Sequence, residues 1–351
     1  MSKELEIQGI QDRIALLIKK LNVLKKDRIV KTDGSEQFKL DQEIEELEKE
    51  LLTEKAQLAK LQSAHNPSLN NTLSTKFNTH HQFTANRTKQ DGDFIKYIYQ
   101  KAETSEKLHF FYLHGGDLQE HKGLYKRFVN KLAGRDTDFK TDYKASDIIV
   151  KDFDAIRFPN YTEEETLKIG IASSLMDSLN IPERDMAKVL DKNLAYALAE
   201  SPDLENLTTH DKVCFFLSIS ESNWNAQLTP DITRWFITHF CQKGFPENAP
   251  HFYFFFAVEY DEDNETIKEE LSTALDKADF TVALPELEMV SKKDIQAWLD
   301  HYDDFWPRRS DRKKTFKKHF EEEGEEMYMD DVQFLLLKII NEINNAEKYG
   351  T

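Results

Sequence analysis

The sequence predicts an α/β fold, in which a three-layer domain with a mostly parallel sheet follows an antiparallel helical hairpin. Two observations predict the domain. Its apolar runs, such as 109–115, 213–219 and 251–260, are short and continuous, which is typical of strands buried on both faces. Helical patterns separate these runs, and alternating strands and helices favour a parallel sheet. A third observation, a coiled-coil pattern over residues 4–63, predicts the hairpin.

The hairpin rests on two apolar stripes with alternating steps of three and four residues. Residues 31–35, Lys-Thr-Asp-Gly-Ser, separate the two helices, because Asp-Gly breaks a helix and Ser35 can cap the next one. We expect this module, residues 1–63, to mediate oligomerisation or partner docking; a solvated spacer or a lid on the main domain is the alternative. The stripes are Ile10, Ile14, Leu17, Leu21 and Leu24 in the first helix, and Ile44, Leu47, Leu51, Leu58 and Leu61 in the second.

Residues 64–85 read as a linker, because the segment is polar, rich in Asn and Thr, and has no sustained period. His80 and His81 fall here and are expected in a solvated loop. The α/β domain is then expected over residues 86–351. Its predicted strands are 109–115, 147–151, 213–219, 251–260 and 281–285. Its predicted helices are 90–101, 118–133, 163–180, 185–200, 230–242, 264–277, 291–302, 311–322 and 329–346.

Composition narrows the class of function. The 351 residues carry a formal net charge of −17, which disfavours non-specific binding to nucleic acid. Seven Lys and Arg residues between 308 and 318 form a local basic patch, but five glutamates follow at once, so a solvated helix face is the simpler interpretation. Cys214 and Cys241 are expected in the core. No apolar signal core begins the chain and no run is long enough for a membrane span, so we expect a cytoplasmic protein with no membrane partner.

The first strand–loop–helix unit lies where a phosphate loop would. A working loop reads Gly-x-x-x-x-Gly-Lys-Ser/Thr, and its backbone N–H groups, Lys and hydroxyl hold the phosphates and Mg²⁺. Counting from Gly116, His121 replaces the second Gly, Lys122 falls on the Lys position and Gly123 replaces the hydroxyl residue. The domain is therefore predicted to be a degenerate P-loop type, with Gly115, Gly116 and Lys122 as the remnant of a nucleotide site.

The other strand ends offer no catalytic set. The carboxyl end of the third strand carries Ser218, Ser220 and Glu221. Glu221 could activate a water, but no Asp precedes it to hold a metal. The run Glu259–Asp263 reads as a helix N-terminus, where acidic residues are favourable. We therefore predict no catalytic residue, no metal site and no cofactor.

Three segments of the globular part resemble the inactive STAND domain, a relative of the signal-transduction ATPases with numerous domains that has lost its ATPase motifs. NRTKQDGDFIKYI (86–98) is similar to its Asn/Asp-Arg-x-x-Gln helix. HFFYLHGGDLQEHKGLYKRF (109–128) resembles its strand and Gly-Asp-x-x-Gln loop. VALPELEMVSKKDIQAWL (282–299) resembles its Leu-Pro-x-Leu strand exit and Asp-x-x-x-Trp helix.

The resemblance implies a role in bacterial conflict or antiviral defence, as an adaptor between a sensor or partner and a toxic effector. The expected function is a non-enzymatic regulatory adaptor that acts through protein–protein contacts, with an effector or sensor protein of the same system as partner and a possible homo-oligomer through the coiled coil. The alternatives are a nucleotide-responsive switch or weak NTPase with a degenerate P-loop, and a structural spacer attached to an unrelated domain.

Overall fold

The computed structural model describes residues 77, 79–101, 104–134, 148–159, 163–181, 186–276, 280–306 and 308–348, and five single positions, 13, 17, 20, 40 and 47. The chain divides into two compact units, Met1–Ser74 and Thr75–Thr351. All five single positions fall in the first unit and are helical. Among the described residues, no helix is long and apolar enough to cross a membrane.

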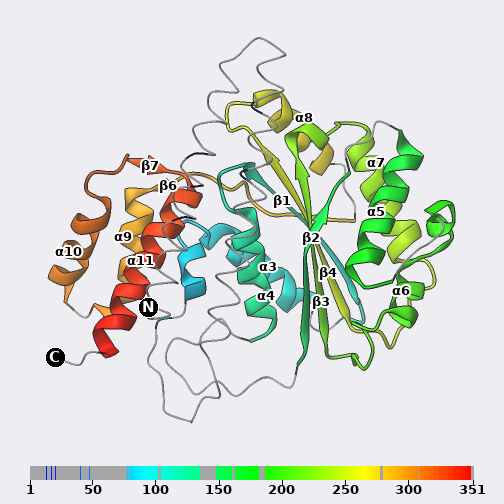
Figure 1. Ribbon diagram of the computed structural model, residues 1–351, viewed down its shortest axis with the longest axis horizontal. Helices are drawn as coiled ribbons and strands as arrows, with labels where there is room; N and C mark the ends of the chain where they lie inside the picture. The colour runs from blue at the N-terminus through cyan, green and yellow to red at the C-terminus, as the bar shows by residue number, and fades with distance from the viewer. Residues whose placement is uncertain are drawn as a thin grey trace. The chain divides into compact units, whose positions relative to one another are not determined.

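A five-stranded parallel sheet organises the second unit, which confirms the predicted α/β class with a mostly parallel sheet (Figure 1). Its strand order is β2-β3-β4-β1-β5, so the first and third strands of the chain both flank β4. The strands are β1 (Leu108–Gly116), β2 (Val150–Arg157), β3 (Lys212–Ser220), β4 (His251–Tyr260) and β5 (Val282–Ala283). Because all five run in one direction, the carboxyl ends of β1, β3 and β4 share one edge of the sheet.

Helices cover both faces of the sheet, which makes three layers. On one face lie α3 (Thr88–Lys101) and α4 (His121–Leu132); the other carries the remaining helices of this region. These are α5 (Glu164–Ser178), η2 (Met186–Asp191), α6 (Leu194–Glu200), α7 (Leu228–Trp235), the π-helical turn η4 (Phe236–Cys241) and α8 (Glu265–Asp276). A short turn, η3 (Glu221–Asn223), follows β3.

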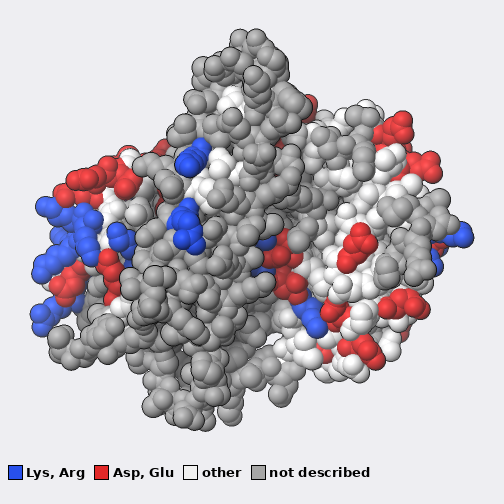
Figure 2. All heavy atoms as spheres, in the orientation of Figure 1, with Lys and Arg blue, Asp and Glu red and all other residues white. Residues whose placement is uncertain are grey.

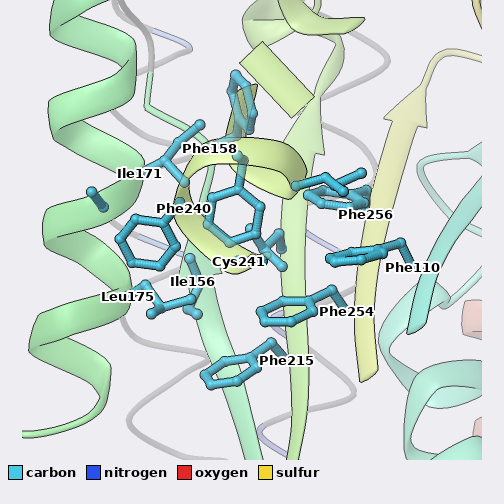
Figure 3. Close-up of a cluster of buried hydrophobic side chains, with 14 of the residues drawn as sticks. Phe110, Ile156, Phe158, Ile171, Leu175, Phe215, Phe240, Cys241, Phe254 and Phe256 are labelled. Atoms are coloured by element: carbon cyan, nitrogen blue, oxygen red, sulfur yellow. The ribbon is translucent and has the colours of Figure 1, made fainter. Parts of the chain in front are cut away.

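Phenylalanine rings fill both interfaces between sheet and helices. On the face covered by α5, Phe254 stacks on Phe110 and Phe215, with ring centroids 5.3 and 4.9 Å apart (Figure 3). On the opposite face, Phe111 stacks on Phe255 at 5.0 Å. Adjacent parallel strands in register bring equivalent side chains together, so a Phe on one strand meets a Phe on the next. This is why continuous apolar runs, rather than alternating ones, mark these strands.

A second hydrophobic cluster gathers the C-terminal helices with the segment before α3. It comprises η1 (Thr79–Phe83), α9 (Lys292–His301), η5 (Asp303–Phe305), α10 (Arg309–Phe320), α11 (Met329–Lys348) and the antiparallel pair β6 (Val290–Ser291) and β7 (Glu326–Met327). Phe77 is buried there and stacks on Phe305 at 4.1 Å. His81 is buried as well, and its Nδ1 lies 2.8 Å from the Tyr302 hydroxyl.

The expectation of a solvated loop at His81 is therefore wrong. Phe77 and residues 79–85 of the predicted linker belong to the folded unit, because Phe77 and His81 pack against α9 and the turn that follows it. The rest of that linker lies outside the described residues.

Two other boundaries differ from expectation. The predicted helix 185–200 is two pieces, η2 and α6, because Asn193 caps the start of α6 and its side chain accepts a hydrogen bond from the Tyr196 N–H. The second strand is longer than the predicted 147–151 and reaches Arg157, with a bulge between Phe153 and Ile156.

Candidate functional site

The loop between β1 and α4 is filled by groups from other segments of the chain. Gly115 forms a parallel bridge with Leu287, and a Cβ at this position would lie 2.7 Å from both the Leu287 Cβ and its carbonyl oxygen. The glycine is therefore required by a neighbouring backbone. In a working phosphate loop the glycine would instead let the backbone approach a ligand.

A carboxylate occupies the space beside Gly116. A Cβ on Gly116 would lie 2.5 Å from Glu262 Oε1, and the buried side-chain amide of Gln119 donates to the same oxygen. A phosphate at this place would have to displace Glu262 and would then meet the carboxylates of Asp117, Asp261 and Asp263. The negative charge gathered here also acts on the nearby Tyr328: its pKa is raised first by burial and then by these four carboxylates. Both volume and charge oppose an anionic ligand here.

The two substituted positions of the motif serve packing. His121 begins α4 and is buried; its burial, with smaller effects of Arg87 and His114, lowers its pKa to about 3, so the ring is neutral at physiological pH. Gly123 lets the Phe83 ring approach, because a Cβ there would lie 2.5 Å from Phe83 Cδ1. The position that should hold Mg²⁺ through a hydroxyl is therefore a contact between α4 and η1.

Lys122 is drawn toward the edge strand. Its Nζ lies 3.2 Å from Asp154 Oδ2 on β2, and Lys126 pairs with the same carboxylate at 2.6 Å and with Asp152. The three residues predicted as a nucleotide-site remnant are thus adjacent in the fold but differ in role. Gly115 and Gly116 admit neighbouring groups to the loop, and Lys122 belongs to an ion-pair network with β2.

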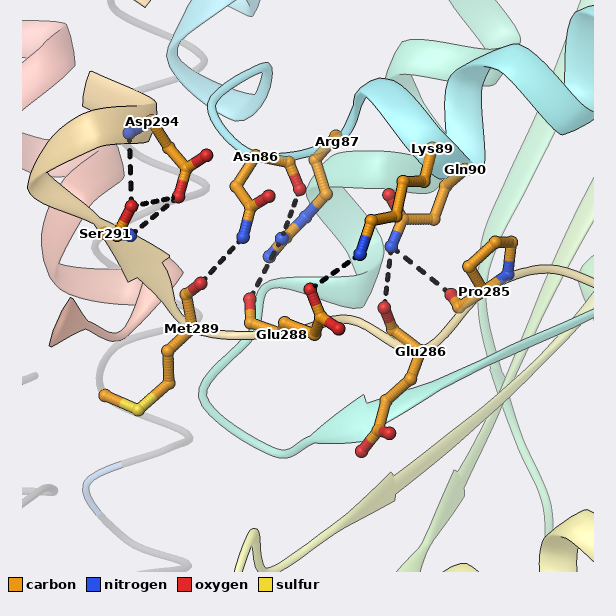
Figure 4. A network of polar contacts seen from close by, with 10 residues as sticks. All are labelled: Asn86, Arg87, Lys89, Gln90, Pro285, Glu286, Glu288, Met289, Ser291 and Asp294. Atoms are coloured by element: carbon orange, nitrogen blue, oxygen red, sulfur yellow. Dashed lines mark hydrogen bonds and ion pairs between the residues drawn. The ribbon is translucent and has the colours of Figure 1, made fainter. Parts of the chain in front are cut away.

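The side chains of Asn86, Arg87 and Gln90 form what we call the clip. They hydrogen-bond the loop and the start of α3 to the segment that leaves β5 (Figure 4). Asn86 Nδ2 donates to the Met289 carbonyl at 2.7 Å, and Gln90 Nε2 donates to the Glu286 carbonyl at 2.7 Å. Between them, Arg87 donates to the carbonyl oxygens of Asn86 (3.0 Å), Glu288 (3.2 Å) and Gln119 (2.9 Å).

Arg87 is 1% exposed, and burial lowers its pKa to about 10, so it stays protonated at neutral pH. A buried cation must have its donors matched, and carbonyl oxygens do this without a carboxylate. Sequence reasoning used Asn86, Arg87 and Gln90 only as a family motif and missed this role. The pattern Asn-Arg-x-x-Gln at a helix start, with two long polar side chains on one turn, was the available signal.

The carboxyl ends of β3 and β4 are likewise tied to each other. Glu221 Oε2 accepts the Asp261 N–H at 2.8 Å, and its Oε1 accepts Asn264 Nδ2 at 2.7 Å. The side chain proposed as a possible hydrolytic base thus organises the turn into α8. Within the described ranges, no group of three or more His, Cys, Asp or Glu residues has a geometry suited to a metal ion.

The remaining sequence candidates have simple outcomes. Cys214 and Cys241 are buried free thiols, and burial raises the pKa of each. In the predicted hairpin, Leu17 is helical and buried and Leu47 is helical and half-buried. The other predicted partner-binding residues, Ile10, Ile14, Leu21, Leu24, Ile44, Leu51, Leu58 and Leu61, lie outside the described residues.

Comparison with known proteins identifies one family. The family model described as "inactive STAND" matches residues 82–258, just over half of the chain. No curated protein matches the sequence significantly.

Solved structures give only distant likenesses. The ORC2 protein of Aeropyrum pernix in ADPNP–ADP complexes is similar at 13% identity and a TM-score of 0.41, over 80% of this chain and 66% of that one. The ORC1 protein of the same organism, in complex with DNA, is similar at 9% identity and a TM-score of 0.38, over 76% of this chain. The chain spans 62% of that ORC1 protein, less than two thirds.

Proposed function

Because the chain belongs to the inactive STAND family, we propose that it is a non-enzymatic regulatory adaptor. In this proposal it couples a partner or trigger to an effector protein of a bacterial defence system through protein–protein contacts. The observation that carries the non-enzymatic part is the filled loop: Glu262 lies against Gly116 and accepts from Gln119, while Arg87 holds the Gln119 carbonyl from behind.

This arrangement supports a structural role for the loop between β1 and α4. In a nucleotide-binding loop, backbone donors and cations are available to a ligand. Here the nearby cations contact protein groups instead: Arg87 donates to carbonyl oxygens and Lys122 pairs with Asp154. A ligand could shift the equilibrium between two conformations only through differential affinity for them. In this proposal the signal enters through contacts with another protein.

We assign partner contact and self-association to the helical hairpin, residues 1–63, acting in the cytoplasm without nucleic-acid or membrane partners. The apolar stripes described above support this assignment, since two amphipathic helices that bury one stripe against each other leave further apolar side chains without cover. Leu17, which is buried, and Lys20, which lies one turn away and is exposed, offer a matched pair for a test.

The test compares Leu17→Glu with Lys20→Glu in the full chain by light scattering coupled to size-exclusion chromatography, and by co-purification with an effector encoded beside the gene. We expect Leu17→Glu to lower the mass to that of a monomer and to lose the effector, because a carboxylate at this buried position disrupts the hairpin, while Lys20→Glu behaves as wild type. Unchanged mass and unchanged effector binding in Leu17→Glu would remove the hairpin from the proposal.

A nucleotide-responsive switch is the second candidate, and one observation favours it. Lys122 stands at the expected position of the motif and its side chain is 46% exposed, so it could turn from Asp154 toward a ligand. A rise in Tm with Mg²⁺–ATP that disappears in Lys122→Ala would support this function over the adaptor. The unchanged Tm that we expect would exclude it.

A further inference from the structure

Helix α10 concentrates positive charge on a chain that is strongly negative overall. Seven of the eleven residues from 308 to 318 are Lys or Arg and only one, Asp311, is acidic, whereas the whole chain carries −17. The helix belongs to the second hydrophobic cluster, against which Phe316 and Phe320 pack. Its inward side is therefore fixed, and most of the charged side chains lie on the outward side.

Two of the seven cations have a structural task. Arg312 is only 14% exposed; its guanidinium donates to Asp300 Oδ1 at 2.8 Å and to the Trp306 carbonyl at 2.6 Å, which joins α10 to α9 and η5. Lys318 pairs with Glu342 of α11 at 2.7 Å. These two contacts explain why the helix docks, and they leave the other five cations unexplained.

The other five form an outward stripe, which we call the α10 basic face: Arg308, Arg309, Lys313, Lys314 and Lys317. In the part of the chain that the structure describes, the first three pair with no carboxylate. Lys314 and Lys317 have loose partners at 3.8 and 3.6 Å while 82% and 71% exposed, and such pairs contribute little.

The spacing of this stripe costs stability. Arg309, Lys313 and Lys317 follow one another at intervals of four residues, so like charges stack along one side of the helix. Each such pair destabilises a helix by about 0.2–0.5 kcal/mol. A solvated surface helix has no need of this arrangement, since interspersed acidic residues would serve solubility better. The stripe is consistent with a partner that supplies the missing negative charge.

The acidic flank limits what that partner can be. Glu321, Glu322, Glu323, Glu325 and Glu326 are exposed and follow the stripe directly, and Figure 2 shows their red surface beside the blue surface of α10. The 12 residues of α10 rise over roughly 18 Å. A nucleic acid or an anionic membrane presents negative charge over a longer distance and would meet these glutamates. A short protein segment can instead be acidic along α10 and basic where it passes the glutamates.

We propose that the α10 basic face is a docking surface for an acidic helical segment of a partner protein, whose charge changes to basic where it passes Glu321–Glu326. The inference rests on the proposed adaptor function and names a surface and a partner chemistry for it. Its α10 contact is separate from the hairpin contact, so each can fail alone.

The experiment uses the full-length protein and two fluorescein-labelled helical peptides of about 20 residues and identical composition. The first peptide has its Glu residues in one half and its Lys residues in the other; the second alternates them. Anisotropy is measured near 50 and 150 mM NaCl for wild type, for Lys313→Glu/Lys317→Glu, and for Lys96→Glu/Lys243→Glu, a control that changes the net charge equally at exposed lysines elsewhere. A 20-base-pair duplex DNA and phosphatidylserine vesicles serve as competing probes.

We expect wild type and control to bind the block peptide more tightly than the alternating one, and Lys313→Glu/Lys317→Glu to bind it at least tenfold more weakly. Equal binding of both peptides, or of the block peptide by all three proteins, would overturn the proposal. Tighter binding of DNA or vesicles than of the block peptide, lost in the same variant, would overturn it as well and assign the surface to a polyanion. A failure here leaves the Leu17→Glu experiment unaffected.

Discussion

Replacing Arg87 by Met tests whether the clip holds the loop between β1 and α4 in place. The change keeps much of the volume but removes the charge and every donor. Three carbonyl oxygens, those of Asn86, Gln119 and Glu288, lose their partner, and hydrogen bonds to a charged group contribute about 1.5–3 kcal/mol each. The gain is the relieved desolvation of the guanidinium: a pKa lowered from 12.5 to about 10 corresponds to about 3 kcal/mol.

The balance predicts that Arg87→Met lowers the free energy of unfolding by about 1.5–6 kcal/mol. Urea unfolding followed by circular dichroism measures it. The control is Lys89→Met, because Lys89 is 66% exposed and its pair with Glu288 should contribute less than about 1 kcal/mol. If Arg87→Met unfolds within about 0.5 kcal/mol of the control, the clip does not stabilise the loop and our account of the loop is wrong.

Three further predictions concern the same region and the sheet. Gly115→Ala should destabilise the protein by about 1–3 kcal/mol, because the added Cβ would meet the backbone of Leu287. Gly92→Ala should stabilise it by about 0.5–1 kcal/mol, because this position lies inside α3 and an added Cβ there would meet no neighbouring group within 4 Å. Urea unfolding should therefore show changes of opposite sign for the two variants. Stability should fall as pH drops from 6.5 toward 3, since burial first and neighbouring positive charge second lower the pKa of His109 and of His121 to about 3 and only the unfolded chain takes up these protons. At pH 5 each histidine should cost about 2 kcal/mol, and His121→Leu should flatten this acid limb; an acid limb of unchanged slope would show that His121 is not a neutral core residue.

Strands and layers were accessible from sequence because their signal is local. A run such as 251–260 is apolar throughout only where both faces are covered, and helical periods between such runs imply the cover. The second cluster was not accessible in this way. Phe77 and His81 stand in a polar, aperiodic stretch, and their burial depends on α9 and on Tyr302, more than 200 residues later in the chain.

The loop shows the same limit at the site. The missing second glycine and hydroxyl could be read at His121 and Gly123, but the reason they are tolerated could not. Glu262 reaches Gly116 only because β1 and β4 are neighbours in the sheet, and nothing local to either segment encodes that pairing. Lys122 stands at the Lys position of the motif, but its ion pair could not be read from that position. Its partner Asp154 lies on β2, beyond the predicted end of that strand at residue 151.

Nucleotide titration tests the central claim, that the loop is a packed joint and no longer a ligand site, most directly. Unfolding is followed by differential scanning calorimetry with and without about 5 mM Mg²⁺–ATP; a site with a Kd of about 50 µM would add about 2.7 kcal/mol to the stability of the folded protein. We predict no change in Tm for wild type and none for Lys122→Ala. A saturable rise in wild type that Lys122→Ala abolishes would contradict the account, because it would show that Glu262 and Asp154 yield their places to a phosphate.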